Sequence, residues 1–530
     1  MCSTRTIDQV FRQMTEQFSE KTALIYEEEK YSFAELNQLV EQLAGALYAH
    51  GIGKQDKVII YLPHLPESII TWLSLQRLGA VPIPVSHFYE HQFLHYIVND
   101  CQVETMVCTP ANFHQVKKAA ANTGLKRIIL VDCQDVSEQA NQLDSKSIQL
   151  LGFDHLIQAP ASSLPAVAIE SGEIAEILYT SGTTGLPKGV PIYHQYFIEQ
   201  ITQARDLSEP VIARGQGVTI QGAPLNHVLG QELGLGSLLS GDCLILLPQL
   251  NLDLLLEHIE KYQATTFFGT QTLLRMILEH ENLDQFQLNS LVYVFTGGEA
   301  LPAEVARKWL QKFGNPIYQG YGCTECCGAI TGLKAAEPFP EGTVGKIVPN
   351  KKYKLVNAET LEPVAKGEAG ELLVYAEHMT KSYWQSPEET AKRFLEFDQL
   401  VWFRTGDIVE NNEDGWVFFK ERSVDMIKHK GYRVAPSKIE GVLYRHEAVS
   451  SCCVVGVPDL KVGEKIKAFV VLKAGAGNVS ADDLINWCKD KLVSYEIPHF
   501  IEFRSDLPKS PTGKILRKVL REQELAKTAG

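Results

Sequence analysis

The sequence lacks the features that mark a secreted or membrane-spanning protein. Its N-terminus, Met-Cys-Ser-Thr-Arg-Thr-Ile-Asp, has no apolar core of a signal peptide. The longest apolar region, 244–256, is interrupted by Pro248, Asn251 and Asp253 and is too short to span a bilayer. We therefore expect a soluble, cytoplasmic protein with no transmembrane segment.

An excess of positive charge is also missing. The 530 residues carry a formal net charge of −14, and the isoelectric point is about 5.6. This balance gives no basic footprint for nucleic acid, so we expect no nucleic-acid partner. A protein of this charge that binds a polyphosphate needs its cations concentrated in one place.

The eleven cysteines do not form the pattern of a disulfide scaffold or a zinc site. They are scattered along a long chain, which favours reduced thiols in a cytosol. Cys323, Cys326 and Cys327 form a CxxCC group, but no second pair or CxxxH partner completes a tetrahedral zinc set. We interpret these three as small apolar wall residues.

The first part of the chain alternates strand-like and helix-like segments, which is typical of a parallel sheet with helices on both faces. A capping box of Ser32 and Glu35 marks the start of one helix. The expected segments are a helix from 33 toward 51, strand 58–61, helix 68–78, strand 105–108, helix 112–121 and strand 127–131. The more polar stretch 134–172, with several prolines, is expected to be a connection.

A second alternation of similar size follows. Its expected segments are helix 228–240, strand 243–247, helix 251–261, strand 264–268, helix 270–280, strand 291–295, helix 302–312 and strand 316–319. Short alternating runs with Gly-rich turns between 340 and 420 then predict a small β subdomain.

Beyond a boundary near 420 the pattern predicts a compact α+β unit. Its expected segments are helix 436–446, strands 450–457 and 466–472, helix 481–491, strand 499–503 and a last helix from 514. We therefore predict an α/β protein with a large N-terminal domain, 1–420, of two βα-layered parallel-type sheets plus a small β subdomain. A smaller, mobile α+β domain, 421–530, follows it.

The most informative stretch is Tyr-Thr-Ser-Gly-Thr-Thr-Gly-Leu-Pro-Lys-Gly-Val at 179–190. It follows an alternating apolar run, 174–179, that predicts a strand. Glycines let backbone N–H groups approach an anion, hydroxyls add donors, and Lys188 adds a positive charge. The spacing differs from the usual P-loop, because Gly185 and Lys188 are separated by Leu-Pro. The chemistry predicts a phosphate-binding loop; a Ser/Thr/Gly-rich surface linker would have a similar composition.

This stretch resembles the phosphate-loop signature of the adenylate-forming enzymes, which include acyl-CoA synthetases, peptide-synthetase adenylation domains and beetle luciferases. At least five family signatures follow one another in the family's order along residues 20–520. The resemblance implies that one set of loop residues binds ATP. This set is Thr180, Ser181, Gly182, Thr183, Thr184, Gly185 and Lys188.

The second resembling signature is Gly-Tyr-Gly-Cys-Thr-Glu at 320–325, directly after a predicted strand. Loops at the carboxyl ends of parallel strands form ligand sites in open α/β sheets. Tyr321 can stack on a purine, and a carboxylate such as Glu325 can hold Mg²⁺ beside phosphate oxygens. Without its context a Thr-Glu pair is ordinary surface. The resemblance implies catalytic roles for Thr324 and Glu325, and Mg²⁺ bound at Glu325 and Thr183.

Further signatures border the nucleotide and the acyl group. The resemblance implies nucleotide contacts from Gly298, Glu299, Ala300, Gln319, Gly320, Tyr321 and Gly322, and ribose contacts from Asp407 and Arg422. It implies an acyl and thiol pocket of His227, Gly297, Cys326, Cys327 and Gly328. His227 follows Asn226 where the family usually has an aromatic residue, so we assign it to binding and not to base catalysis.

The C-terminal signatures concern both halves of a two-step reaction: the lysine serves the first step and the crossover loop serves the second. The resemblance implies a coenzyme A or crossover loop of Lys428, Lys430, Gly431, Tyr432 and Arg433, and a catalytic lysine at Lys514. The family's hinge position is usually Asp or Lys, but here it is Val424, which is β-branched and stiff at χ1. The pivot is therefore expected at Val424 or at Asp425.

The implied reaction joins a carboxylate to ATP as an acyl-adenylate with release of pyrophosphate, and then transfers the acyl group to a thiol with release of AMP. We expect an acid–thiol ligase acting on an apolar fatty or aryl acid, with ATP, Mg²⁺ and coenzyme A. An enzyme that loads a carrier protein's phosphopantetheine is the alternative of the same fold. A non-catalytic nucleotide-binding scaffold is the alternative from another class, and the presence of Lys188, Glu325 and Lys514 speaks against it.

Overall fold

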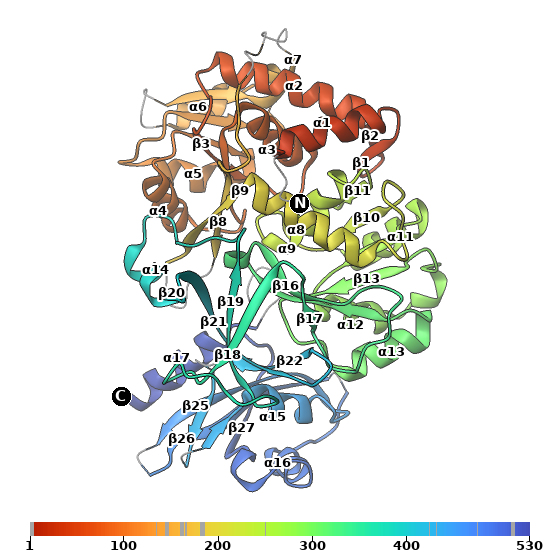
Figure 1. The fold of residues 1–530 in the computed structure, drawn as a ribbon, viewed down its shortest axis with the longest axis vertical. Coiled ribbons are helices and arrows are strands. Elements are labelled where there is room, and N and C mark those ends of the chain that lie inside the picture. Colours follow the sequence, from red (N-terminus) through yellow and green to blue (C-terminus); the bar gives the residue numbers. More distant parts are fainter. Residues whose placement is uncertain are drawn as a thin grey trace.

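The fold combines parallel and antiparallel sheets in a large N-terminal part and a smaller C-terminal part (Figure 1). The computed structural model describes residues 5–133, 135–143, 148–158, 164, 167–180, 186–249, 251–422, 425–430, 432–459, 461–473, 475–509 and 515–529, with the backbone alone at 433, 528 and 529. In this part of the chain no helix is both long and apolar enough to cross a bilayer. The predicted α/β architecture is confirmed.

The first sheet is five-stranded and parallel, in the order β4-β3-β5-β6-β7. Its strands are β3 Lys57–Tyr61, β4 Val81–Pro84, β5 Thr105–Cys108, β6 Arg127–Leu130 and β7 Gln149–Gly152. The helices of this region are α1 Ile7–Gln17, α2 Phe33–Ala49, α3 Pro66–Leu78, α4 His91–Cys101, α5 Phe113–Ala120, α6 Ser137–Gln142 and α7 Phe153–Gln158. The expectation of a plain connection at 134–172 was wrong, because α6, β7 and α7 lie there.

The second sheet is seven-stranded, in the order β14-β13-β12-β10-β11-β1-β2, and only its β1–β2 edge pair is antiparallel. Its strands are β1 Thr22–Tyr26, β2 Glu29–Ser32, β10 Val218–Gln221, β11 Cys243–Leu246, β12 Thr266–Phe268, β13 Tyr293–Thr296 and β14 Ile317–Gln319. Its outer helices are α11 Leu252–Tyr262, α12 Gln271–Leu278 and α13 Ala303–Phe313.

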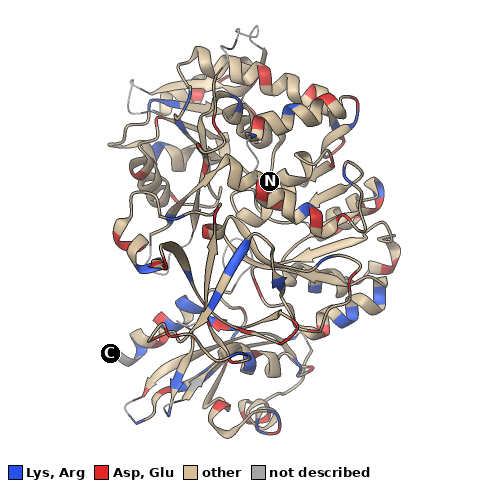
Figure 2. Cartoon of the chain, viewed as in Figure 1, with Lys and Arg blue, Asp and Glu red and all other residues tan. Residues whose placement is uncertain are grey.

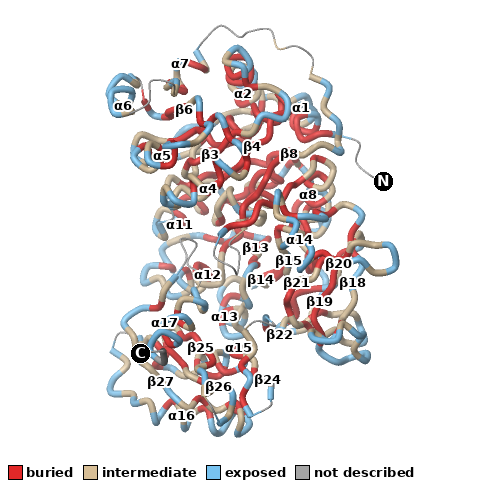
Figure 3. Tube along the Cα trace, turned by 90° about the vertical axis from the view of Figure 1, so that its left-hand side faces the viewer, coloured by how far each residue is buried: buried red, intermediate tan, exposed pale blue. Residues whose placement is uncertain are grey.

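Helix α3 belongs to the core that joins these two sheets, and nearly all of its residues are buried. Several of its buried polar side chains form hydrogen bonds or ion pairs inside the protein. Ser74 donates to Val40 O at 3.1 Å, Gln76 Nε2 donates to Ala175 O at 2.9 Å, and Arg77 pairs with Asp8 at 2.9 Å. Buried residues run along the strands of the sheets (Figure 3).

A separate two-stranded antiparallel hairpin, β8 Ile174–Thr180 and β9 Lys188–Tyr193, carries the predicted phosphate loop. The expected strand before the loop is confirmed, and the return strand β9 is a further element. Helix α8 His194–Ser208 follows directly.

The expected helix 228–240 is divided into α9 Val228–Gly230, a π-helical turn η2 Gln231–Leu235 and α10 Gly236–Leu238. Close backbone packing accompanies this irregularity. A Cβ at Gly230 would lie 2.0 Å from Pro224 O, and a Cβ at Gly234 would lie 2.2 Å from Gln221 Oε1.

The β subdomain is an eight-stranded antiparallel sheet, in the order β15-β16-β17-β22-β21-β19-β18 with β20 on β21. Its strands are β15 Tyr321–Cys323, β16 Gly328–Gly332, β17 Gly345–Ile347, β18 Lys351–Val356, β19 Gly370–Ala376, β20 Phe394–Phe397, β21 Leu400–Asn411 and β22 Trp416–Arg422. Helix α14 Pro387–Arg393 precedes β20. The strand β22 continues two residues past the expected domain boundary at 420, and that boundary stays a prediction.

The C-terminal part is a five-stranded sheet in the order β24-β23-β26-β25, with β27 parallel to β26. Its strands are β23 Ile427–His429, β24 Tyr432–Val434, β25 Val449–Asp459, β26 Gly463–Leu472 and β27 Phe500–Phe503. Its helices are α15 Pro436–Leu443, α16 Ala481–Lys489 and α17 Arg517–Ala529. The expected helix at 436–446 therefore ends three residues early.

Candidate active site

The predicted nucleotide segments meet at the carboxyl ends of two neighbouring parallel strands. β13 and β14 are paired with Thr296 opposite Gln319. A Cβ at Gly297 would lie 3.3 Å from Gly320 O, and Gln319 Nε2 donates to Glu299 O at 3.1 Å. The structure thus brings the 297–300 and 319–322 segments into contact, which is the position where open α/β sheets bind ligands.

Tyr321, Asp407 and Arg422 form one polar cluster across β15, β21 and β22. The Tyr321 hydroxyl donates to Asp407 Oδ2 at 2.6 Å, and Arg422 Nε lies 3.2 Å from Asp407 Oδ1. Burial, and next the charge of Asp407, raise the pKa of Tyr321 well above its ordinary value. Strand β21 continues past Asp407 to Asn411 and places Asp407 directly opposite Arg422.

The phosphate-loop hairpin closes at the pair Thr180 and Lys188. Lys188 is 8% exposed, and its ammonium forms an ion pair with Glu389 of α14. The hydrogen bond from Lys188 lowers the pKa of Glu389 to about 2. The lysine that the sequence assigned to a polyphosphate is therefore held here by a carboxylate.

Tyr383 joins the hairpin to the predicted magnesium carboxylate. The Lys188 ammonium lies 5.2 Å from the centre of the Tyr383 ring, and the Tyr383 hydroxyl donates to Glu325 Oε1 at 2.7 Å. Glu325 and Thr324 lie in the short helical turn η4 Thr324–Cys326, directly after β15. Sequence reasoning missed Tyr383 and Glu389; the nearby Ser-Pro-Glu-Glu start of α14 was the available signal.

Three of the predicted acyl-side residues, Cys326, Cys327 and Gly328, lie in the same turn or directly after it. Cys326 and Cys327 are buried in the central core, and Gly328 has φ +112°. His227 caps α9, and its Nδ1 accepts from Leu229 N at 3.4 Å. Among the described residues no group of three His, Cys, Asp or Glu side chains is placed to hold a metal ion.

The predicted crossover residues form a hairpin in the C-terminal sheet. Lys428 lies opposite Arg433 in the β23–β24 pair, Lys430 has φ +52°, and Tyr432 stacks on Tyr495 at 4.1 Å between ring centres. β24 lies low in the C-terminal part, well away from β13 and β15 (Figure 3). The structure therefore does not bring this hairpin to the nucleotide segments.

Several predicted residues lie outside the described part of the chain. They are Ser181, Gly182, Thr183, Thr184, Gly185, Val424, Gly431 and Lys514, together with the side chain of Arg433. Their roles stay predictions.

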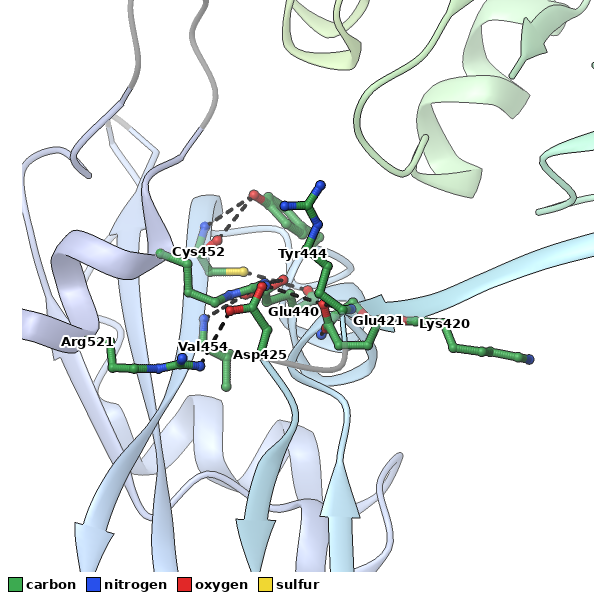
Figure 4. Close-up of polar contacts among 11 residues, drawn as sticks. Lys420, Glu421, Asp425, Glu440, Tyr444, Cys452, Val454 and Arg521 are labelled. Carbon is green, nitrogen blue, oxygen red and sulfur yellow. Dashed lines mark hydrogen bonds and ion pairs between the residues drawn. The ribbon is translucent and has the colours of Figure 1, made fainter. Parts of the chain in front are cut away.

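A charge cluster lies where the two parts of the chain join. Arg517 of α17 pairs with Glu440 at 2.7 Å, with Asp425 at 3.2 Å and with Glu421 at 3.4 Å. Figure 4 shows Glu421, Asp425 and Glu440 gathered there with Arg521. Glu421 is the next-to-last residue of β22, and Asp425 is one of the two predicted hinge residues, so Arg517 connects the last helix to both sides of the junction.

The model of the AMP-binding enzyme family matches residues 11–384, and that of the AMP-binding enzyme C-terminal domain matches residues 438–514. The chain belongs to the AMP-binding enzyme family. Its relatives in this family include a long-chain-fatty-acid–CoA ligase of Bacillus subtilis, 29% identical over 98% of this chain and 95% of the relative. A ligase of the same name from Haemophilus influenzae is 30% identical over 89% of this chain and 86% of the relative.

Solved AMP-binding enzymes share the fold over nearly the whole chain. An anthranilate CoA ligase in complex with anthranoyl-AMP has a TM-score of 0.89 and 26% identity, covering 99% of this chain and 98% of the other. A benzoate CoA ligase from Burkholderia xenovorans has a TM-score of 0.84 and 27% identity, covering 98% and 100%. The family resemblance of the sequence and its adenylate-forming fold are thereby confirmed.

Proposed function

We propose that this protein is an ATP-dependent acyl-CoA ligase for a fatty or aryl carboxylic acid. Two contacts carry the proposal, in a chain of the AMP-binding enzyme family. The 297–300 and 319–322 segments meet at the carboxyl ends of β13 and β14, and Tyr321 contacts Asp407, which pairs with Arg422. Several relatives that are similar to this chain over most of both chains are named as CoA ligases.

In the first step the substrate carboxylate attacks the α-phosphorus of ATP, and the bond to the bridging oxygen of pyrophosphate breaks. Asp407 accepts hydrogen bonds from the ribose hydroxyls, and Tyr321 stacks on the adenine. The 181–185 loop and Lys188 hold the leaving pyrophosphate, and Lys514 offsets charge on the carboxylate and α-phosphate. Such transfers depend on positioning and charge neutralisation more than on covalent help.

For Lys188 to reach a polyphosphate it must exchange its partner Glu389. ATP brings several negative charges to that ammonium, and Glu389 retains Lys392 as its second cation at 2.6 Å. The exchange therefore leaves neither charge without a counterion.

Glu325 is the protein residue that would hold Mg²⁺, with Thr183 beside the phosphates. A single carboxylate suits an ion that keeps water and substrate phosphate oxygens as ligands. The hydrogen bond from Tyr383 fixes the orientation of this carboxylate. When bound, the ion neutralises phosphate charge.

In the second step the coenzyme A thiolate attacks the acyl carbon, and AMP leaves. The crossover hairpin lies away from the acyl-side residues in this arrangement. We therefore propose that the C-terminal domain, 421–530, turns about Val424 or Asp425 and presents Gly431 to the thiol tunnel.

A cytoplasmic location fits the ten described cysteines, all of which are free thiols.

The test is pyrophosphate release with ATP, Mg²⁺ and a panel of fatty, aryl, amino and dicarboxylic acids, with and without coenzyme A. Sustained turnover with a fatty or aryl acid that requires coenzyme A is the expected result. Release that stops after about one equivalent per enzyme would instead point to a carrier-protein acceptor. No release with any acid would contradict the proposal.

A further inference from the structure

The lysine at the base of the phosphate-loop hairpin meets a carboxylate from a helix that is distant in the sequence. Lys188 is the first residue of β9 and pairs with Thr180 of β8, so its side chain lies where the predicted phosphate loop returns to the hairpin. Its ammonium donates to Glu389 Oε2, in the first turn of α14 and 201 residues further along the chain. A carboxylate therefore occupies the cation that the sequence assigns to a polyphosphate.

The ammonium of Lys188 needs a counterion, because its side chain is buried. Lys188 is 8% exposed, and Glu389 is partly buried beside it. A buried charge that loses its partner is costly, because it has already given up its water. Hydrogen bonds from Lys188 and Lys392 lower the pKa of Glu389 to about 2, so this carboxylate is ionised near neutral pH. Glu389 thus provides the negative charge that Lys188 requires.

Other contacts of the same segment place Glu389 opposite Lys188. Trp384 lies five residues before Glu389, and its backbone N–H donates to Gly189 O at 2.8 Å. A Cβ at Gly189 would lie 2.9 Å from the Cβ of Trp384, so the two segments are in close contact. The Trp384 indole N–H donates to Asp100 O at 3.2 Å. The fold therefore holds the segment before α14 against β9 independently of the ion pair.

Glu389 keeps a second cation when Lys188 leaves it. Its Oε1 accepts from Lys392 Nζ at 2.6 Å, one turn further along α14. Figure 2 shows acidic and basic residues together on this helix, red and blue at the left of the molecule; the acidic residues lie in its first turn and the basic residues in its last. Separation therefore costs the carboxylate little, whereas the buried ammonium needs another anion in its place.

We infer that Glu389 is a positioning residue that competes with polyphosphate for Lys188 and takes the ammonium back as pyrophosphate leaves. The inference rests on the proposed function, in which Lys188 holds the leaving pyrophosphate, and it adds how that product is released. Binding energy that is equal in the ground state and the transition state does not speed the chemical step, and a tightly held product slows turnover. Glu389 lowers the affinity for the polyphosphate without touching the reacting atoms.

The test measures the binding of inorganic pyrophosphate and of ATP, each with Mg²⁺, to the full-length enzyme by isothermal titration calorimetry. Glu389→Gln keeps the size of the side chain and removes its charge. We expect both dissociation constants to fall about tenfold, at the lower end of the range for a hydrogen bond to a charged group. A purely structural role of Glu389 would instead weaken binding or leave it unchanged, and either result would overturn the inference.

Glu388→Gln is the matched control, because Glu388 lies in the same turn of α14 and is exposed. It removes the same charge from a neighbouring position, so a general change of the electrostatic field would appear in both variants. At about 0.15 M salt, which screens exposed charges more than buried pairs, we expect its dissociation constants to change less than about twofold. An equal gain of affinity in the two variants would overturn the inference.

A double-mutant cycle identifies Lys188 as the group for which Glu389 competes. Without the ammonium, in Lys188→Met, the carboxylate has nothing to release, so Glu389→Gln should no longer increase the affinity for pyrophosphate. A gain of affinity that persists in the absence of Lys188 would contradict direct competition.

Circular dichroism and the thermal midpoint establish that each variant is folded. Glu389→Asp is a second variant, which keeps the charge but withdraws it by one methylene, and it should give a smaller gain of affinity in the same direction. If the wild type binds ATP and pyrophosphate and both folded variants bind them equally well, the inference alone fails. If the wild type binds neither, the proposed function fails with it.

Discussion

At the scale of single residues, Tyr383 connects two functions that the sequence places far apart. Its ring lies under the Lys188 ammonium, and its hydroxyl holds Glu325. Tyr383→Phe keeps the ring and removes only the donor. Since hydrogen bonds that orient metal ligands contribute about 10–100-fold to affinity or activity, the Mg²⁺ concentration for half-maximal pyrophosphate release should rise about tenfold.

A Mg²⁺ titration of the initial rate measures this change. Tyr375→Phe is the control, because the Tyr375 ring of β19 packs at a tilt against Trp402 of β21. A Mg²⁺ dependence in Tyr383→Phe equal to that of wild type would contradict the proposal that Glu325 binds the metal.

Glu176 makes a second residue-scale prediction, about stability. Burial raises the pKa of Glu176 to about 7 from an ordinary value near 4.5. A carboxyl group whose pKa is higher in the folded state binds more protons when the protein is folded. Its contribution to the free energy of unfolding is therefore fully present below pH 4.5 and is lost as the pH rises toward 7. Glu176→Gln removes this loss, which amounts to about 3 kcal/mol.

Urea unfolding of wild type and Glu176→Gln at pH 5 and pH 8 tests the sign. The two proteins should differ little at pH 5, and the variant should be the more stable at pH 8. A difference that does not change with pH would mean that Glu176 is not a buried proton-binding group.

At the scale of elements, α17 is joined to α15 through one bidentate pair. Arg517 Nη2 donates to both oxygens of Glu440, at 2.7 and 2.8 Å. Removing one partner of a buried pair costs about 3–5 kcal/mol, because the other charge stays buried. Glu440→Gln should therefore destabilise the C-terminal domain by a few kcal/mol and leave the N-terminal domain intact.

Limited proteolysis measures this effect by domain. We expect the protease to digest the C-terminal domain faster than in wild type, while the N-terminal fragment persists as long as in wild type. Glu522→Gln, an exposed glutamate on the same helix, is the control. Equal protease resistance in Glu440→Gln and wild type would contradict the proposed fastening role.

The same scale shows how far the sequence could predict this structure. Strands with strong apolar runs, such as β3 and β5, were predicted to within one residue because their burial is visible in composition. The strand β7 was missed, because its edge position leaves it with little buried apolar surface. The return strand β9 was missed because its pairing with β8 forms only in the folded protein.

The candidate site divides along similar lines. The residues of the contiguous signatures, such as Tyr321 and Asp407, were predictable, and the structure brings these two together. The roles of Tyr383, Glu389 and Glu176 were not predictable from the sequence. Each of these side chains meets its partner only in the folded protein, and that partner lies more than fifty residues away in the sequence. A single sequence has no periodicity that records such contacts.

At the scale of the whole molecule, Arg275 of α12 makes a contact between the N-terminal and C-terminal parts of the chain. Its Nη1 donates to Ser450 O of β25 at 2.6 Å. A turn of the C-terminal domain would break this bond, so it stabilises one arrangement over the other. Arg275→Gln should change the half-reaction served by this arrangement about tenfold more than the other, as expected at the lower end of the range for a charged hydrogen bond.

Single-turnover measurements of adenylate formation and of thioester formation separate the two. Arg307→Gln is the control, because Arg307 lies on the neighbouring helix and contacts Glu304 and Gln311 of its own helix. Equal effects of Arg275→Gln on both half-reactions would contradict a change of arrangement between them.

The junction contacts of Arg517 also depend on the order of synthesis. Glu421 leaves the ribosome first, and its partner Arg517 follows 96 residues later. Domains generally fold as units, N-terminal first. The large sheets therefore complete their pairing while Glu421, next to the end of β22, still lacks the Arg517 guanidinium. A chaperone or protease that binds the nascent chain in that interval encounters a folded N-terminal domain whose contacts with Arg517 have not yet formed.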